Sequence, residues 1–235
     1  QDNLGARAQF LWKASDTLTV KNIFSYGVSK ESYSFNLQGE NITRPFVVTN
    51  PGPDEGQGNQ WTLSEELQLQ GELLDRRLSF TVGGFYFKQK PSGTQGGSSI
   101  VYCPAAFTGF CDSSLTRYSS TQESKALYAQ ATLDFGVVAP ALEGLRLTGG
   151  YRQTWDKITG FSTNIQANPG VPGTVKCGAT GETNVPVADQ FTRCTFNVAL
   201  KTDAPTWTVG LDYKITPKIL AFAKVSRGYK SGGLN

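Results

Sequence analysis

The chain has no histidine and no methionine among its 235 residues. Without histidine it lacks the commonest general base and the commonest protein metal ligand, which argues against a hydrolytic triad. No stretch comes near the roughly 18 uninterrupted apolar residues that mark a transmembrane helix, so such a helix is excluded. The chain begins at Gln1 without an initiator or a signal peptide, and we expect a mature or truncated piece of a longer protein.

Charge is also sparse, with 17% charged residues and a net charge of only +3. The charged residues are scattered and form no basic run, so we expect no nucleic-acid partner. The apolar share is 38% and the mean hydropathy is −0.30. These values are compatible with a transmembrane β-barrel, because the strands of such a barrel are only half apolar.

The four cysteines fall in two close pairs, Cys103 with Cys111 and Cys177 with Cys194. Each pair lies in one polar segment rich in glycine and proline, which predicts two local disulfides formed in an oxidising compartment. A zinc site would need C-x-x-C spacing or nearby histidine, and neither is present. We therefore expect no metal site, no cofactor and no catalytic residues.

Alternation of apolar and polar residues is the main feature that the chain does show, and it is clearest near the end. Trp207, Val209, Leu211, Tyr213 and Ile215 alternate with Thr208, Gly210, Asp212 and Lys214. This period of two predicts a strand with one apolar and one polar face. Residues 216–218 predict a tight turn, after which residues 219–230 return antiparallel.

The same alternation recurs along the chain and predicts eight strands in four hairpins. The strands cover residues 6–13, 18–37, 61–70, 78–87, 127–135, 145–156, 207–215 and 219–230. Short turns are expected at 14–16, 73–76, 136–144 and 216–218, and long loops at 38–59, 91–121 and 158–203. We expect a bend or bulge at Gly83-Gly84. Short turns on one rim and long loops on the other predict an all-β, antiparallel, up-and-down transmembrane barrel.

The aromatic residues fall in two bands near the strand ends. The lower band contains Phe10, Trp12, Phe135, Tyr213 and Phe222, and the upper band contains Tyr26, Trp61, Tyr86, Trp155, Trp207 and Tyr229. Amphipathic rings prefer the two lipid–water interfaces, so these residues predict an aromatic girdle. Three polar residues fall on the lipid face in this interpretation, namely Asn22, Glu65 and Gln153.

The stretch Leu220 to Asn235, L-A-F-A-K-V-S-R-G-Y-K-S-G-G-L-N, resembles a barrel strand of TonB-dependent outer-membrane receptors. In that family a strand ending in S-R-G-[FY]-K-[SP]-G-G-[FL]-N is common. Residues 63–69 (L-S-E-E-L-Q-L), 80–87 (F-T-V-G-G-F-Y-F) and 147–156 (L-T-G-G-Y-R-Q-T-W-D) are similar to the same family in the same order.

The resemblance implies a barrel of about 22 strands with a plugged lumen in the outer membrane of a Gram-negative bacterium. Residues 1–235 would be part of its single barrel domain, without the plug. The protein would not be an enzyme but would import a ferric siderophore or a similar bulky nutrient. Its partners would be outer-membrane lipid, the nutrient, and TonB through a missing N-terminal region.

The polar faces of the strands would then face the plug and water. This inward set comprises Arg7, Lys21, Glu66, Asp134, Arg146, Arg152, Asp156, Asp212 and Lys214. Two other functions stay open from the sequence alone. One is a passive porin-like small barrel of about eight strands. The other is a secreted, disulfide-stapled β-sandwich that binds glycans, although a sandwich gives no reason for aromatics to gather at strand ends.

Overall fold

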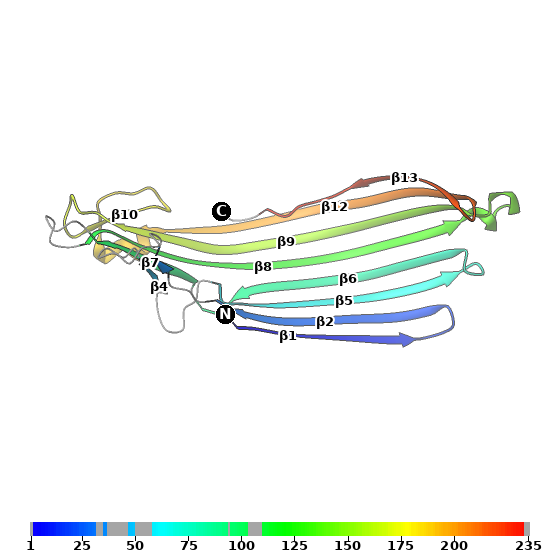
Figure 1. Ribbon diagram of the computed structural model, residues 1–235, viewed down its shortest axis with the longest axis horizontal. Helices are drawn as coiled ribbons and strands as arrows, with labels where there is room; N and C mark the ends of the chain where they lie inside the picture. The colour runs from blue at the N-terminus through cyan, green and yellow to red at the C-terminus, as the bar shows by residue number, and fades with distance from the viewer. Residues whose placement is uncertain are drawn as a thin grey trace.

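The computed structural model describes residues 2–31, 35–36, 47–49, 58–93, 95–102 and 110–232. Eight long strands form four hairpins. The pairs are β1 (Asp2–Lys13) with β2 (Leu18–Lys30), β5 (Gln60–Leu73) with β6 (Leu78–Pro91), β8 (Phe110–Asp134) with β9 (Leu145–Ala167), and β12 (Thr195–Thr216) with β13 (Ile219–Arg227). Each strand runs antiparallel to its neighbour, in the order β1-β2-β5-β6-β8-β9-β12-β13 (Figure 1). The predicted up-and-down antiparallel sheet is confirmed.

The four hairpin connections lie together at one end of the sheet (Figure 1). The connection between β8 and β9 contains two 3-10 turns, η1 (Phe135–Val137) and η2 (Pro140–Leu142). Asp134 caps the first of them, because its Oδ1 accepts a hydrogen bond of 2.8 Å from the Gly136 amide. At the same end the Arg77 guanidinium lies 3.6 Å from this carboxylate, which joins two adjacent hairpins.

At the opposite end β8, β9 and β12 run 17, 11 and 12 residues beyond their predicted ranges, so the loop boundaries at 121, 158 and 203 are wrong. β2 instead ends at Lys30, seven residues short of the predicted end at 37. β8 starts at Phe110, β9 continues to Ala167 and β12 starts at Thr195. The missed segments, such as S-S-L-T-R-Y-S-S-T-Q-E-S at 113–124, are polar on both faces. A strand that faces water on both sides needs no alternation of apolar and polar residues. These segments therefore lack the period of two that predicts a strand.

In the described part of the chain, five short strands lie at this end of the sheet. They are β3 (Phe35–Asn36), β4 (Val47–Thr49), β7 (Gln95–Tyr102), β10 (Thr174–Cys177) and β11 (Val185–Pro186). β7 pairs with the extended part of β8, and β10 pairs with the extended part of β9. Most of the predicted loop at 38–59 lies outside the described residues.

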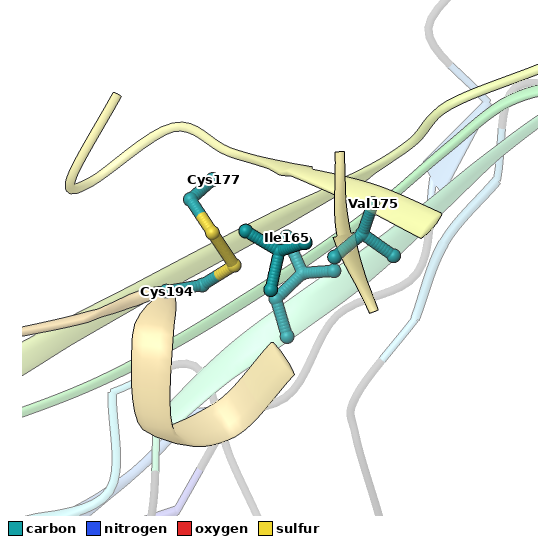
Figure 2. Close-up of a cluster of buried hydrophobic side chains, with 5 residues drawn as sticks. Ile165, Val175, Cys177 and Cys194 are labelled. Carbon is teal, nitrogen blue, oxygen red and sulfur yellow. A yellow bond between two sulfur atoms is a disulfide. The ribbon is translucent and has the colours of Figure 1, made fainter. Parts of the chain in front are cut away.

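A small apolar core sits at this end, beside η3 (Val187–Asp189) and α1 (Gln190–Arg193). It consists of Ile165, Val175, Val185 and the Cys177–Cys194 disulfide, with Leu115 packed against it (Figure 2). The predicted Cys177–Cys194 pairing is thus present. The predicted Cys103–Cys111 pairing lies outside the described residues and side chains. We call residues 168–194, which include this disulfide, the cap.

The long strands form a single layer, and β1 and β13 each pair with one neighbour in the described part of the chain. Alternate residues therefore lie on two distinct faces. The apolar face, called outward here, exposes large side chains that include Phe10, Leu67, Leu127, Val209 and Val225. Burying so much apolar surface requires either a second layer or lipid. Among the described residues no helix is long and apolar enough to cross a membrane.

Candidate functional site: the inward face

The polar face of the sheet, called inward here, carries an open hollow of ≈ 840 Å³. Its lining comes from β5, β6, β8, β9, β12, the end of β13 and the segment after it. The residues used below are Glu66, Phe85, Tyr128, Arg152, Asp156 and Tyr229. Because the lumen side of such a barrel is polar and its outer side carries an apolar band, the polar residues identify this face as the one that points into a barrel.

A hydrogen-bonded group occupies the middle of the hollow. Glu66 Oε1 accepts a hydrogen bond of 2.5 Å from the Tyr128 hydroxyl and one of 2.9 Å from Gln68 Nε2. The Arg152 guanidinium lies over two rings, 5.2 Å from the centroid of Phe85 and 5.9 Å from that of Tyr128. The hollow therefore presents one cation held against aromatic faces, beside a carboxylate that already has two donors.

Gly83 makes room for this group, and the bulge predicted at Gly83-Gly84 is wrong. The pairing of β6 with β5 and β8 runs through both glycines without a register shift. A Cβ on Gly83 would lie 2.5 Å from the Tyr128 ring and hydroxyl, so only glycine lets Tyr128 lie across β6 and reach Glu66. Phe85 lies two residues after Gly83 and therefore on the same inward face, which explains why it interrupts the alternation of apolar outward residues in β6.

Nearer the hairpin connections, Arg146 and Asp212 form an ion pair across β9 and β12. The Oδ2 atom of Asp212 lies 2.7 Å from Arg146 Nε and 2.6 Å from Nη2. Lys214 follows on the same face of β12 and is exposed. The five strongest inward candidates, Arg146, Arg152, Asp156, Asp212 and Lys214, thus share one face, but they fall into three separate groups along it.

At the loop end of the hollow, Tyr229 donates a hydrogen bond of 3.0 Å to Asp156 Oδ2. Asp156 is 8% exposed, and its Oδ1 has no partner among the described residues. Burial raises the pKa of the Tyr229 phenol, and the hydrogen bond to Asp156 acts in the same direction. The predicted place of Tyr229 in the outward girdle is wrong, because the chain leaves β13 after Arg227 and turns to the inward side.

We expect Tyr229→Phe to loosen the segment after β13, because the variant loses a hydrogen bond to a buried carboxylate worth about 1 kcal/mol. Trypsin cleavage after Lys230 should then be about fivefold faster in the full-length protein. Tyr213→Phe, an outward tyrosine 39% exposed, is the matched control and should leave the rate unchanged. Equal rates in both variants would show that the Asp156 contact does not hold the segment.

The raised pKa of Tyr229 gives this contact a pH dependence. A phenol whose folded pKa exceeds its unfolded value contributes stability that is fully present below about pH 10. That contribution is lost as the pH rises through the folded pKa. The absorbance titration of wild type minus Tyr229→Phe should therefore show a phenol that ionises above pH 10; ionisation at or below pH 10 would contradict it.

The other predicted girdle residues lie on the outward face. They are Trp12, Tyr26, Trp61, Trp155, Trp207 and Tyr213. The rings of Tyr26 and Trp61 are stacked, with centroids 6.4 Å apart. Phe222, expected in the lower band, lies opposite Asp212 on the inward face. A register shift between Lys214 and Thr216 changes the facing of β13, which the sequence does not reveal.

The three polar residues expected on the lipid face, Asn22, Glu65 and Gln153, each have a hydrogen-bond partner. Asn22 Nδ2 donates a hydrogen bond of 2.9 Å to Glu65 Oε1 across β2 and β5. Gln153 Nε2 donates to Asp203 Oδ1 across β9 and β12. Pairing of this kind lowers the cost of polar groups that face lipid.

Two of the inward residues, Tyr128 and Phe85, were not recognised from the sequence. Tyr128 stands among small and polar residues in β8, and Phe85 follows the misleading Gly-Gly pair. Alternation along the strand could have identified Tyr128, because it lies two residues before the inward Gln130 and opposite Gly83.

Comparison with known proteins supports the same architecture. The family model described as TonB dependent receptor-like, beta-barrel, matches residues 1–235. The chain belongs to the TonB-dependent receptor barrel family. This family serves transport across the outer membrane and is not a family of enzymes. The expected outer-membrane location is therefore confirmed, and the soluble β-sandwich is excluded.

Two solved structures show the same fold. The ferric yersiniabactin uptake receptor FyuA from Yersinia pestis matches 99% of this chain with a TM-score of 0.59 and 14% identity. The ferric-catecholate import receptor Fiu from E. coli K12, in its open form, matches 95% with a TM-score of 0.55 and 14% identity. The chain spans 30% of the first and 35% of the second. It therefore corresponds to about a third of such a TonB-dependent receptor.

Proposed function

We propose that this chain is part of an active-transport receptor that imports a ferric siderophore or a similar bulky nutrient, with energy relayed through TonB. The observation that carries the proposal is the inward hollow of ≈ 840 Å³, where Arg152 lies against Phe85 and Tyr128. A fixed cation framed by aromatic rings suits a ligand that is anionic and has flat or apolar surfaces. Many ferric chelates have both properties.

The extended ends of β8, β9 and β12 support the capture step. These strand ends hold the cap beyond the apolar band, so an incoming ligand would contact the cap before it enters the lumen. The cap is fastened to β8 and closed on itself, because Arg117 lies 5.1 Å from the Phe191 ring and Arg193 pairs with Glu182 at 2.5 Å. A held cap is suited to binding, since fewer groups must be ordered when the ligand arrives.

The two similar structures are themselves named as receptors for ferric yersiniabactin and ferric catecholates. These names favour an iron chelate over other bulky nutrients for this chain as well. A passive porin-like barrel is the competing function. The two differ in energy use, because a passive pore lets solutes through without TonB.

The test is uptake of a radioactive ferric siderophore panel by cells whose only receptor is the full-length protein. We expect uptake of at least one chelate, its loss when TonB is deleted, and a substantial reduction in Arg152→Gln. Lys214→Gln, which removes an inward charge outside the hollow, is the control and should take up the chelate normally. Uptake that persists without TonB would overturn the proposal in favour of a passive pore.

A further inference from the structure

Four lysines gather on the outward face at one level of the sheet. Lys88 of β6 lies opposite Glu123 of β8, and Glu123 lies opposite Lys157 of β9. Lys157 in turn lies opposite Lys201 of β12. Lys125 is two residues from Glu123, and therefore on the same face. We call Lys88, Lys125, Lys157 and Lys201 the lysine row.

The lysine row has too few anions to balance it. Glu123 is shared, with its Oε1 2.8 Å from Lys125 Nζ and its Oε2 3.8 Å from Lys88 Nζ. Neither Lys157 nor Lys201 has an ion pair within the part of the chain that the structure describes. Like charges directly opposite each other in an antiparallel pair are destabilising, so an anion bound beside Lys157 and Lys201 would stabilise them.

Two other carboxylates on this face, Asp203 and Glu65, do not remove the imbalance. Asp203, two residues from Lys201, accepts a hydrogen bond from Gln153 and lies opposite Trp155. Glu65 lies opposite Tyr86 and accepts a hydrogen bond from Asn22. Counting both carboxylates together with Glu123 still leaves the four lysines with one excess positive charge. A phosphate group, with more than one negative oxygen, would match that excess.

The lysine row lies at the level of lipid headgroups. Lys88 is ten residues beyond Leu78, the first residue of β6 after its hairpin connection. At about 3.3 Å per residue and a tilt of roughly 40°, that rise is about 25 Å, the height of the apolar band of an outer-membrane barrel. Tyr86 and Trp155 flank Lys125 on the neighbouring strands, as interfacial aromatics do.

An apolar hollow of ≈ 450 Å³ opens just below the lysine row on the same face. Gly84 lies in its floor, Leu67, Leu127 and Trp155 are in its walls, and Glu65 and Lys125 line it at the level of Tyr86. A Cβ on Gly84 would lie 3.5 Å from Leu127 Cδ2, so the space exists because this residue has no side chain. An acyl chain fits such a hollow, whereas a free anion gains nothing from it.

We propose that the lysine row and the hollow over Gly84 form a binding site for one phosphorylated lipid of the outer leaflet. Its phosphate lies against Lys125, Lys157 and Lys201, and one acyl chain fills the hollow. Charge complementarity selects a phosphorylated lipid over a neutral one, and the adjoining hollow selects a lipid over inorganic phosphate. The site faces away from the nutrient path and does not depend on the nutrient imported.

The test is native mass spectrometry of the full-length protein in detergent, titrated with bisphosphorylated lipid A. Each lysine near a membrane surface contributes about 1 kcal/mol to the binding of an anionic lipid. The double variant Lys157→Gln/Lys201→Gln should therefore bind this lipid at least about tenfold more weakly. Lys13→Gln/Lys218→Gln removes two lysines at the hairpin end and is the matched control. Equal affinity in the two double variants, or equal binding of phosphatidylcholine by wild type, would overturn the proposal.

A second variant tests the hollow without changing charge. Gly84→Val puts a side chain into the hollow, and strands such as β6 tolerate β-branched residues well. This variant should bind lipid A more weakly than wild type, while its affinity for inorganic phosphate should be unchanged. If millimolar inorganic phosphate displaces the lipid completely, or if Gly84→Val binds it as wild type does, the site is an anion site and the lipid proposal fails.

Discussion

Replacing Ala129 by arginine is expected to destabilise the folded barrel by about 2–4 kcal/mol, whereas arginine at Gln130 should cost little. Ala129 is on the outward face of β8, opposite Val82 of β6 and Tyr151 of β9. It is five residues from the end of β8 at Asp134 and six from Glu123, which lies between Lys88 and Lys157 of the lysine row, so it lies near the bilayer midplane. A charge there loses its hydration, and the long side chain is too far from either interface to restore it.

Gln130 is the matched control because the two residues are adjacent, both exposed in the chain, and on opposite faces. An arginine at Gln130 enters the polar side, next to Thr148 and Asp212 in the lining of a second inward hollow. The measurement is the free energy of unfolding of the full-length protein in lipid vesicles by urea titration. Equal destabilisation by the two variants would show that the faces are assigned wrongly.

The outward and inward faces could be predicted because lipid on one side and polar groups on the other impose the period of two. Where both sides of a strand face water, as in most of residues 113–124, that constraint disappears and the sequence predicts a loop instead of a strand. The facing of β13 was lost for a different reason. A register shift of one residue at Lys214/Thr216 reverses every side chain after it and leaves no mark in composition.

The inward site was predicted only as a set of charges. Alternation predicts the inward facing of Arg152 and Asp156, but their partners Tyr128 and Phe85 come from other strands and Tyr229 from the segment after β13. Those pairings depend on the register between β6, β8 and β9, which a single sequence does not specify. Gly83 is the one sequence feature that points to these contacts between strands, because its missing side chain lets Tyr128 reach Glu66.

Removing the disulfide with Cys177→Ala/Cys194→Ala is expected to destabilise the cap by about 3 kcal/mol while leaving the membrane strands intact. The bond closes a chain segment with a sequence separation of 17, and both cysteines are buried, at 3% and 0% exposure. Alanine keeps the site apolar, so the main loss is the restriction on the unfolded cap. β9 and β12 do not need the disulfide, because their ladder continues from Thr195 to Tyr213.

Hydrogen exchange of the full-length protein measures both parts at once. Amides of Val175 and Cys177 should exchange about a hundredfold faster in the double variant, as 3 kcal/mol implies, while residues 145–156 keep their protection. Val171→Ala/Val187→Ala, at two exposed cap positions, is the control and should change neither. If protection is also lost at 145–156, the cap and the membrane sheet unfold together. In that event the cap would be a structural part of the barrel, because its opening would disrupt the wall that carries Arg152.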